Sequence, residues 1–116
     1  MTDHPSGIAA EELAARFLSG QGLRVIARNY RCRFGEIDLI AQDGDALVFV
    51  EVRLRRSSRF GGAAASITHA KQRKLVATAR CYLAGLRSVP GCRFDAIVLD
   101  ALDTQRIEWL RDIIAE

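Results

Sequence analysis

The sequence has few cysteines, no long hydrophobic run and no tract of low complexity. No apolar stretch approaches the ~20 residues that a membrane-spanning helix needs. The acidic, amphipathic N-terminal segment lacks the basic and then apolar pattern of a signal peptide. The three cysteines are an odd number without the paired spacing of a metal site. We therefore expect a protein of the cytoplasm with free thiols and no membrane partner.

The composition is that of an ordinary globular domain. Hydrophobic residues make up 49% and charged residues 27% of the 116 positions, which excludes a chain that is disordered throughout. Because this length is below the roughly 150 residues of an average domain, we expect residues 1–116 to form one domain around one modest core.

Positive charge is concentrated in the middle of the chain, although the net charge is only +3. Between Arg24 and Arg80, twelve basic residues stand against five acidic ones, and the rest of the chain has an excess of four negative charges. A polyanion such as nucleic acid would be attracted to the middle segment and not to the ends. A solvated surface that is merely rich in arginine explains the same charge equally well.

The spacing of hydrophobic residues predicts the element order α-β-β-β-α-β-β, and hence an α/β protein. The expected helices span 7–20 and 67–86, and the expected strands span 23–31, 35–42, 46–53, 92–100 and 105–110. Asp43-Gly44-Asp45 has the composition of a tight turn, so the second and third strands should form a β-hairpin. A basic, glycine-containing loop is expected over 54–66.

Strict alternation of side chains assigns faces to the residues of this hairpin. On its first strand, Ile37 and Leu39 should share one face, while Glu36 and Asp38 share the other. A four-residue loop over 43–46 would place Asp38 opposite Glu51 and Glu36 opposite Arg53 on the second strand. A two-residue loop would shift these pairs diagonally and keep all four on one face.

Asp38 and Glu51 should therefore lie within reach of one another. Facing carboxylates repel, and apolar neighbours that bury them raise the cost. A divalent cation would remove the repulsion, since Mg²⁺ typically takes one or two carboxylates together with waters and phosphates. The alternative is a solvated face on which Glu36 pairs with Arg53.

Seven motifs that follow one another along residues 7–110 resemble those of the YraN-like family. These are small bacterial proteins that are uncharacterised or regarded as candidate endonucleases. The motifs are Gly7-x-x-x-Glu11-x-x-Ala14-x-x-x-Leu18, Asn29-Tyr30-Arg31, Gly35-Glu36-Ile37-Asp38-Leu39-Ile40, Phe49-Val50-Glu51-Val52-Arg53, Phe60-Gly61, Lys71-Gln72 and Cys92-Arg93-Phe94-Asp95.

The family is in turn similar to a minimal PD-(D/E)XK nuclease core and to archaeal Holliday-junction resolvases. This similarity implies the three-layer, restriction-endonuclease-like core α-β-β-β-α-β with a mixed sheet, to which the last predicted strand is a short addition. It also implies that Asp38 matches the PD aspartate, Glu51 the acid of (D/E)XK, and Glu11 the acid of the first helix. These three would hold Mg²⁺ or Mn²⁺ and, with Arg53, would form the catalytic set.

Arg53 stands where the superfamily pattern has lysine. A lysine there can hold or polarise the attacking water and can lose its proton when buried. An arginine stays protonated, so its role is limited to binding phosphate and stabilising charge, and a metal-bound water would have to supply the nucleophile. Lys71, at the start of the second helix, is another source of an ammonium group, although such a residue is more commonly a solvated helix position.

Three functions agree with these features. The first is a Mg²⁺-dependent endonuclease for structured or branched DNA, and the second is a nucleic-acid-binding module on a nuclease fold with little or no catalysis. The third is an interaction protein that forms a homodimer through a sheet edge or a helix. Phosphate contacts are expected from basic residues beyond the hairpin, namely Arg55, Arg56, Arg59, Lys71, Arg73 and Lys74.

Three aromatic residues lie near the arginines of the middle segment or in its loops, and one further acid stands in the last motif. Phe34 and Phe60 lie in loops among arginines, a pattern found where bases stack on aromatic rings, whereas Tyr30 is expected in the core. Asp95 in the last motif is expected to be structural and to pair with a nearby arginine.

Overall fold

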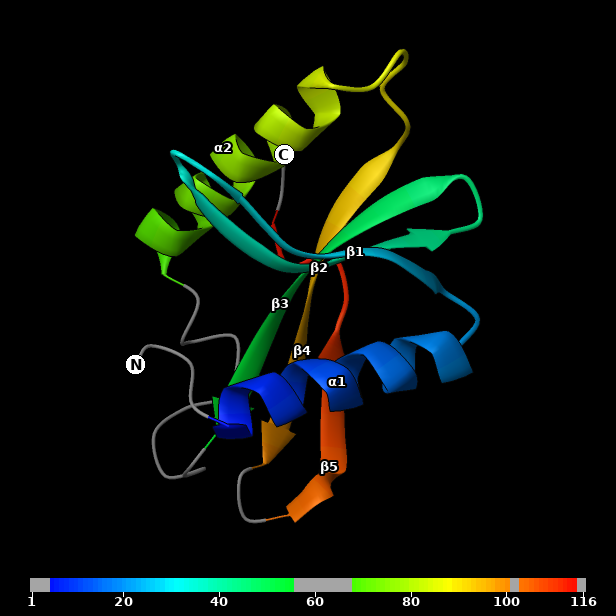
Figure 1. Ribbon diagram of the computed structural model, residues 1–116, viewed down its shortest axis with the longest axis vertical. Coiled ribbons are helices and arrows are strands. Elements are labelled where there is room, and N and C mark those ends of the chain that lie inside the picture. Colours follow the sequence, from blue (N-terminus) through cyan, green and yellow to red (C-terminus); the bar gives the residue numbers. More distant parts are fainter. Residues whose placement is uncertain (1–4, 56–67, 101–102, 115–116) are drawn as a thin grey trace.

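A computed structural model describes residues 5–55, 68–100 and 103–114. The elements are α1 (Pro5–Gly20), β1 (Arg24–Cys32), β2 (Gly35–Asp43), β3 (Ala46–Arg55), α2 (His69–Ala84), β4 (Cys92–Asp100) and β5 (Asp103–Leu110), and Figure 1 shows their arrangement. The order α-β-β-β-α-β-β and the α/β class are those predicted from the hydrophobic spacing. Neither helix in the described segments is long and apolar enough to cross a bilayer.

The five strands form one mixed sheet in the order β1-β2-β3-β4-β5. The pairs β1–β2, β2–β3 and β4–β5 are antiparallel, and the central pair β3–β4 is parallel. Parallel neighbours need a long crossover, and α2 lies within it. β3 is longer than predicted, because Leu54 and Arg55 pair with Leu99 and Asp100 of β4. The loop predicted over 54–66 is therefore wrong for its first two residues, and positions 56–66 lie outside the described part.

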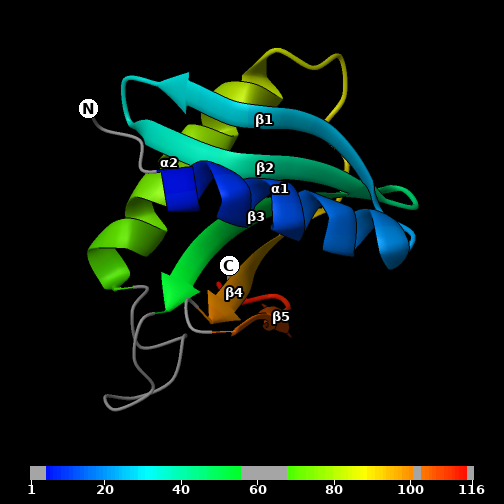
Figure 2. The same cartoon turned by 60° about the horizontal axis from the view of Figure 1, so that its bottom comes forward.

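The two helices cover opposite faces of the sheet, which gives three layers (Figure 2). On one face, small side chains of α1 such as Ala10 and Ala14 share a buried cluster with Leu39 and Val50. On the other face, α2 contributes Leu75 and Ala79 to a second cluster, which also contains Ile37, Ile40, Phe49 and Phe94. Both clusters consist of aliphatic and aromatic side chains whose removal from water drives this layered packing.

The hairpin of β2 and β3 has the register predicted from the four-residue loop. The pairs run from Leu39 with Val50 to Asp43 with Ala46, so the loop itself contains only Gly44 and Asp45. The diagonal shift expected for a two-residue loop is wrong, because Asp43 and Ala46 extend the same ladder by one pair. Gly44 has φ of 60°, a conformation that glycine adopts without steric cost.

β2 departs from strict alternation between Ile37 and Leu39. Leu39 packs in the cluster of α1, whereas Ile37 and Ile40 both pack in the cluster of α2. The predicted sharing of one face by Ile37 and Leu39 is therefore wrong. In a regular strand, residues three apart lie on opposite faces of the sheet. The alternation of side chains between the two faces must therefore be interrupted near Asp38.

β1 makes the same change opposite this point. Ala27 and Tyr30 are also three residues apart, and both pack toward α2. Between them Asn29 has φ of 53°, a left-handed conformation that Asn tolerates better than most residues. The core position predicted for Tyr30 is confirmed, since its ring meets Tyr82 edge-on with centroids 5.3 Å apart.

A buried acid joins β4 to β5 and to the residues after them. Asp95 is fully buried and accepts hydrogen bonds from Arg93 Nε at 3.1 Å, Trp109 Nε1 at 3.0 Å and the Asp112 backbone N–H at 2.9 Å. Arg93 Nη1 also contacts Asp43 at 3.1 Å. The structural role predicted for Asp95, with an arginine partner, is confirmed.

Candidate functional site

Asp38 lies where the hydrogen-bonded ladder between β2 and β3 stops. The last pair of this ladder is Leu39 with Val50. One residue further, the backbone N–H of Val52 donates to Asp38 Oδ2 at 2.8 Å, so a side-chain carboxylate takes part in the bonding between the strands. The side chains of Asp38 and Glu51 meet beyond the end of this ladder, as the sequence predicted, since each influences the ionisation of the other.

The acids share a half-buried environment in which neither ionises easily. Burial, followed by the charge of Glu51, raises the pKa of Asp38 to about 7, although the bond from Val52 opposes this. Burial also raises the pKa of Glu51, against the charges of Arg53 and Lys71 and a hydrogen bond with Asp38. Two carboxyls in contact titrate as a pair, so this pair retains a proton at a pH where ordinary acids have lost theirs.

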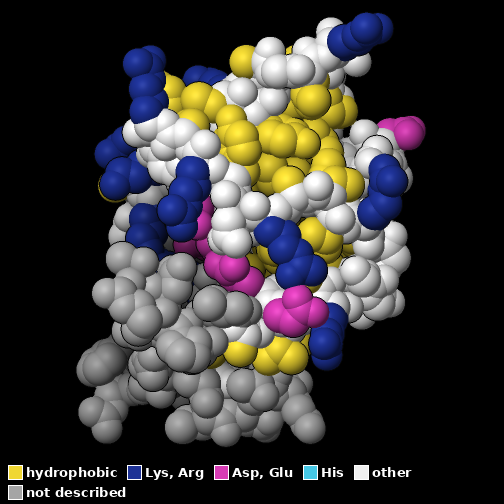
Figure 3. Space-filling view, viewed as in Figure 1, with side chains coloured by type: hydrophobic (Ala, Val, Ile, Leu, Met, Phe, Trp, Pro, Cys, Tyr) yellow, Lys and Arg dark blue, Asp and Glu magenta, His cyan; other side chains and the backbone are white. Residues whose placement is uncertain are grey.

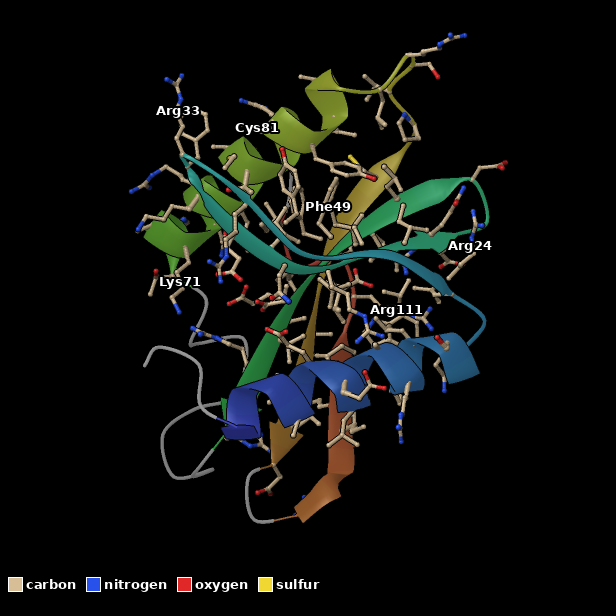
Figure 4. The ribbon with its side chains drawn as sticks, viewed as in Figure 1. Arg24, Arg33, Phe49, Lys71, Cys81 and Arg111 are labelled. Atoms are coloured by element: carbon tan, nitrogen blue, oxygen red, sulfur yellow. The ribbon has the colours of Figure 1, made fainter. Side chains whose placement is uncertain are left out.

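Two cations face this acid pair from different elements. Arg53 Nη1 lies 3.6 Å from Glu51 Oε2, and its side chain is 27% exposed. Lys71 projects from the first turn of α2 (Figure 4), where its backbone N–H donates to Thr68, the residue that caps the helix. α2 begins at His69, two residues later than predicted, because Thr68 itself has an extended conformation and caps the helix.

The side chain of Lys71 belongs to the acid pair and is not simply solvated. It is half-buried. Burial and the charge of Arg53 lower the pKa of this ammonium, while Glu51 and Asp38 act to raise it. The sequence offered Lys71 as an alternative to the missing lysine, and the fold places it within electrostatic reach of both carboxyls.

Glu11 and Glu36 meet at Asn29, on the flank of the acid pair. With its amide nitrogen turned toward them, the Asn29 side chain donates to both acids at 3.2–3.3 Å. Glu36 also forms an ion pair with Arg31 at 3.4 Å, a partner that the sequence did not suggest. The charges of Glu11 and Glu36 contribute to the raised pKa of Asp38.

Asn29 is the site residue to which the sequence reasoning gave no role. It falls within one of the family motifs. What marks it as unusual is its left-handed backbone conformation within a strand, which the sequence alone does not show. Strained residues of this kind cluster at functional sites. Here the conformation turns the amide toward Glu11 of α1 and Glu36 of β2.

The arrangement offers two oxygen ligands rather than a complete metal cage. Within the described segments, no three His, Cys, Asp or Glu side chains lie close enough to hold one ion. Asp38 and Glu51 alone fit the way Mg²⁺ is usually bound, through one or two carboxylates with waters and substrate phosphates as the other ligands. Glu11 lies nearby, where Asn29 holds it.

The residues predicted to contact phosphates divide into three groups. Arg55 is part of β3, only 23% of its side chain is exposed, and it lies 3.7 Å from Glu108. Arg56 and Arg59 lie outside the described residues, as does Phe60. Arg73 and Lys74 are exposed on α2. Figure 3 shows lysine and arginine side chains gathered over the flank that α2 and the β1–β2 turn form, directly beside acidic ones.

The acid pair predicts an unusual dependence of stability on pH. An acid whose pKa is higher in the folded state holds its proton more tightly there, so its contribution is full below the unfolded pKa of about 4 and is lost as the pH rises toward 7. The melting temperature without divalent metal should therefore fall between pH 5 and pH 8. Asp38→Asn keeps an acceptor for Val52 and should flatten this fall.

Thermal melts across this pH range test the assignment. At pH 8 the Asp38→Asn protein should melt above the wild type, because it lacks the charge that repels Glu51. Asp45→Asn, in the exposed hairpin loop, is the matched control and should follow the wild type. Identical pH profiles for Asp38→Asn and the wild type would contradict a raised pKa at this acid.

The sequence is similar to many proteins of one bacterial family. Residues 10–99 match the model of the family described as uncharacterised protein family UPF0102. A UPF0102 protein of Nitrosospira multiformis is 54% identical over 112 residues, which cover 97% of this chain and 94% of the relative. One of Methylobacillus flagellatus is 58% identical over 106 residues, which cover 91% and 93%. Because these matches span nearly the whole of each chain, this protein belongs to the UPF0102 family.

Proposed function

We propose that this protein is a Mg²⁺- or Mn²⁺-dependent endonuclease for structured or branched DNA, built on a PD-(D/E)XK nuclease core like that expected of the YraN-like proteins. The observation that carries the proposal is the half-buried pair Asp38 and Glu51, with Lys71 and Arg53 beside it. The two half-buried carboxylates repel each other, and the neighbouring cations offset the cost of their burial only in part, since the pKa of both acids stays raised. A site that binds a divalent cation and a phosphodiester uses all four.

Each side chain has a distinct role in this proposal. Asp38 and Glu51 would hold the ion, which when bound supplies a Lewis acid for the phosphate and lowers the pKa of water. Arg53 binds the scissile phosphate through its planar guanidinium and stabilises the charge that develops there. Lys71, whose pKa is lowered, positions the attacking water and takes part in moving its proton.

The nucleic acid would lie along the basic flank of α2. Arg73 and Lys74 are exposed there, and contacts of this kind go to phosphates and carry no sequence information. Binding should accordingly be salt-dependent and largely independent of sequence. The three free thiols are compatible with action in the reducing cytoplasm.

A second candidate function is a nucleic-acid-binding module with little or no catalysis. The observation that favours it is Arg53 itself, since a guanidinium cannot take up the attacking water's proton. Under this hypothesis the acid pair and its cations would bind an ion and a backbone phosphate without hydrolysis.

Metal-dependent stabilisation tests the acid pair separately from catalysis. Mg²⁺ or Mn²⁺ at millimolar concentration should raise the melting temperature, because a ligand that binds only the folded state stabilises it. The rise should be larger at pH 8 than at pH 6, since the carboxyls must lose their proton to bind metal. Asp38→Asn combined with Glu51→Gln should abolish the rise, whereas Asp43→Asn at the end of β2 should retain it.

Cleavage then separates the two functions. Labelled four-way junction, duplex and single-stranded DNA would be bound in Ca²⁺ and then exposed to Mg²⁺ or Mn²⁺. Nicked product from the wild type, and none from the Asp38→Asn, Glu51→Gln protein, would support the endonuclease. Salt-dependent binding without product from any of these DNAs would support the binding module. The absence of both binding and metal stabilisation would refute the proposal.

A further inference from the structure

The turn between β1 and β2 presents an aromatic ring to solvent. Cys32 pairs with Gly35, so the turn consists of Arg33 and Phe34 alone. The ring of Phe34 is 43% exposed, and the guanidinium carbon of Arg33 lies 4.8 Å from its centroid. Figure 4 shows Arg33 at this tip, directed away from the sheet. Phe34 contributes little to either core cluster, so packing does not account for it.

This tip is held rigidly in place. The Phe34 backbone N–H donates to Cys32 Sγ at 3.4 Å. Gly35 lies so close to α2 that a Cβ on it would stand 3.1 Å from Thr78 Oγ1. Thr78 is fully buried and donates to the carbonyl of Lys74 at 2.7 Å. The turn is thereby fixed against the middle of α2, and an aromatic ring on a fixed turn loses little entropy when it binds a ligand.

The surroundings of Phe34 carry positive charge. Arg31 and Arg33 are exposed on the turn and on the strand that leads to it, and Lys74 is exposed on α2 beside Gly35. Figure 3 shows lysine and arginine side chains gathered on the flank that α2 and the β1–β2 turn form. Aromatic rings between cations bind nucleic acid by stacking on bases while the cations contact the phosphates.

The separation between this turn and the acid pair can be compared with the spacing of nucleotides along DNA. Phe34 precedes Asp38 by four residues, which is about 13 Å at the rise of a strand. The rise of one strand of duplex DNA is about 3.4 Å per nucleotide. The backbone of the turn therefore lies within about four nucleotides, measured along a duplex, of a phosphate held at Asp38 and Glu51.

We propose that the Arg33-Phe34 turn stacks on a base that has no paired neighbour, and so selects DNA in which a duplex is interrupted within about four nucleotides of the scissile phosphate. This inference rests on the proposed function, because the site that it serves is the acid pair. A continuous duplex offers no free base face to the ring, whereas a junction, a flap or an unpaired base does.

A fluorescent base measures the stacking directly. The probe is a duplex that carries one unpaired 2-aminopurine, bound in Ca²⁺, since stacking on an aromatic ring quenches this fluorophore. The wild type should quench it, and Phe34→Ala should remove the quenching and weaken binding of this probe about 10- to 100-fold. Phe34→Trp should restore both. Binding of the fully paired duplex should be nearly the same in all three proteins.

A matched control and a stability measurement complete the test. Val89→Ala also removes an exposed apolar side chain, 69% exposed and outside the β1–β2 turn, and should leave the quenching unchanged. Thermal melts establish that Phe34→Ala is folded. Equal affinity of wild type and Phe34→Ala for the unpaired probe, without quenching, would overturn the stacking turn and leave the proposed function in place. Loss of metal stabilisation and of all DNA binding in the wild type would instead overturn the proposed function.

Discussion

Replacing Lys71 by methionine should lower Mg²⁺-dependent cleavage at least 100-fold, which is the scale of proton-transfer catalysis. The substitution keeps the length and apolar stem of the side chain but removes the ammonium that lies within electrostatic reach of Glu51 and Asp38. Because the phosphate contacts of Arg73 and Lys74 remain, the affinity for DNA should change little. Single-turnover cleavage at saturating DNA separates the two effects.

Two other substitutions separate the contributions of the basic residues to cleavage. Arg80→Met also removes one positive charge from an exposed position of α2 and should cleave as the wild type does. Arg53→Lys should preserve or increase cleavage under the proposed function, since it provides a titratable ammonium where the PD-(D/E)XK pattern has lysine. Full cleavage by Lys71→Met would show that Lys71 is not part of the catalytic set.

Removal of the Asp95 carboxylate should destabilise the fold by about 3 kcal/mol or more, the scale expected when one partner of a buried ion pair is removed. Asp95→Ala leaves three donors without their acceptor, namely Arg93 Nε, Trp109 Nε1 and the Asp112 backbone N–H. An unsatisfied buried donor costs about 1–3 kcal/mol by itself. Urea unfolding gives the free energy of unfolding of each variant.

A graded pair of variants checks that the loss arises from this network. Asp95→Asn keeps the size of the side chain and one acceptor oxygen, so it should lower the free energy of unfolding less than Asp95→Ala does. Asp43→Ala removes the other carboxylate that contacts Arg93, but Asp43 is 41% exposed and the loss should be below about 1 kcal/mol. A loss from Asp95→Ala as small as that from Asp43→Ala would contradict the structural role of Asp95.

Local sequence determined most of the hairpin that carries the acids. The turn residues Asp43-Gly44-Asp45 and the apolar runs on both sides predicted β2, β3 and their pairing, because turn chemistry and hydrophobic spacing act within a few residues. From that register the meeting of Asp38 and Glu51 followed. Both the element order and this register are confirmed.

The features that sequence could not give depend on contacts between distant segments. The change of face in β2 arises opposite Asn29 of β1, which has a left-handed backbone conformation. The pattern of hydrophobic residues in β2 does not predict this change. Glu36 pairs with Arg31 on the neighbouring strand, and Arg53 lies 3.6 Å from Glu51 on its own strand. The place of Lys71 beside the acids depends on how α2 docks on the sheet, a matter of tertiary packing.

The parallel pairing of β3 with β4 at the centre of the sheet determines the order in which the strands can pair during folding. Leu39 and Val50 are joined by a short hairpin, whereas Leu47 and its partner Cys92 are 45 positions apart. Long loops close slowly. On a ribosome, the strands that bear the two acids emerge and can pair before Lys71 and β4 have left the tunnel. The carboxylates thus assemble early with Arg53 of β3 as their neighbouring cation, and Lys71 joins them only when α2 docks in a later and slower step of folding.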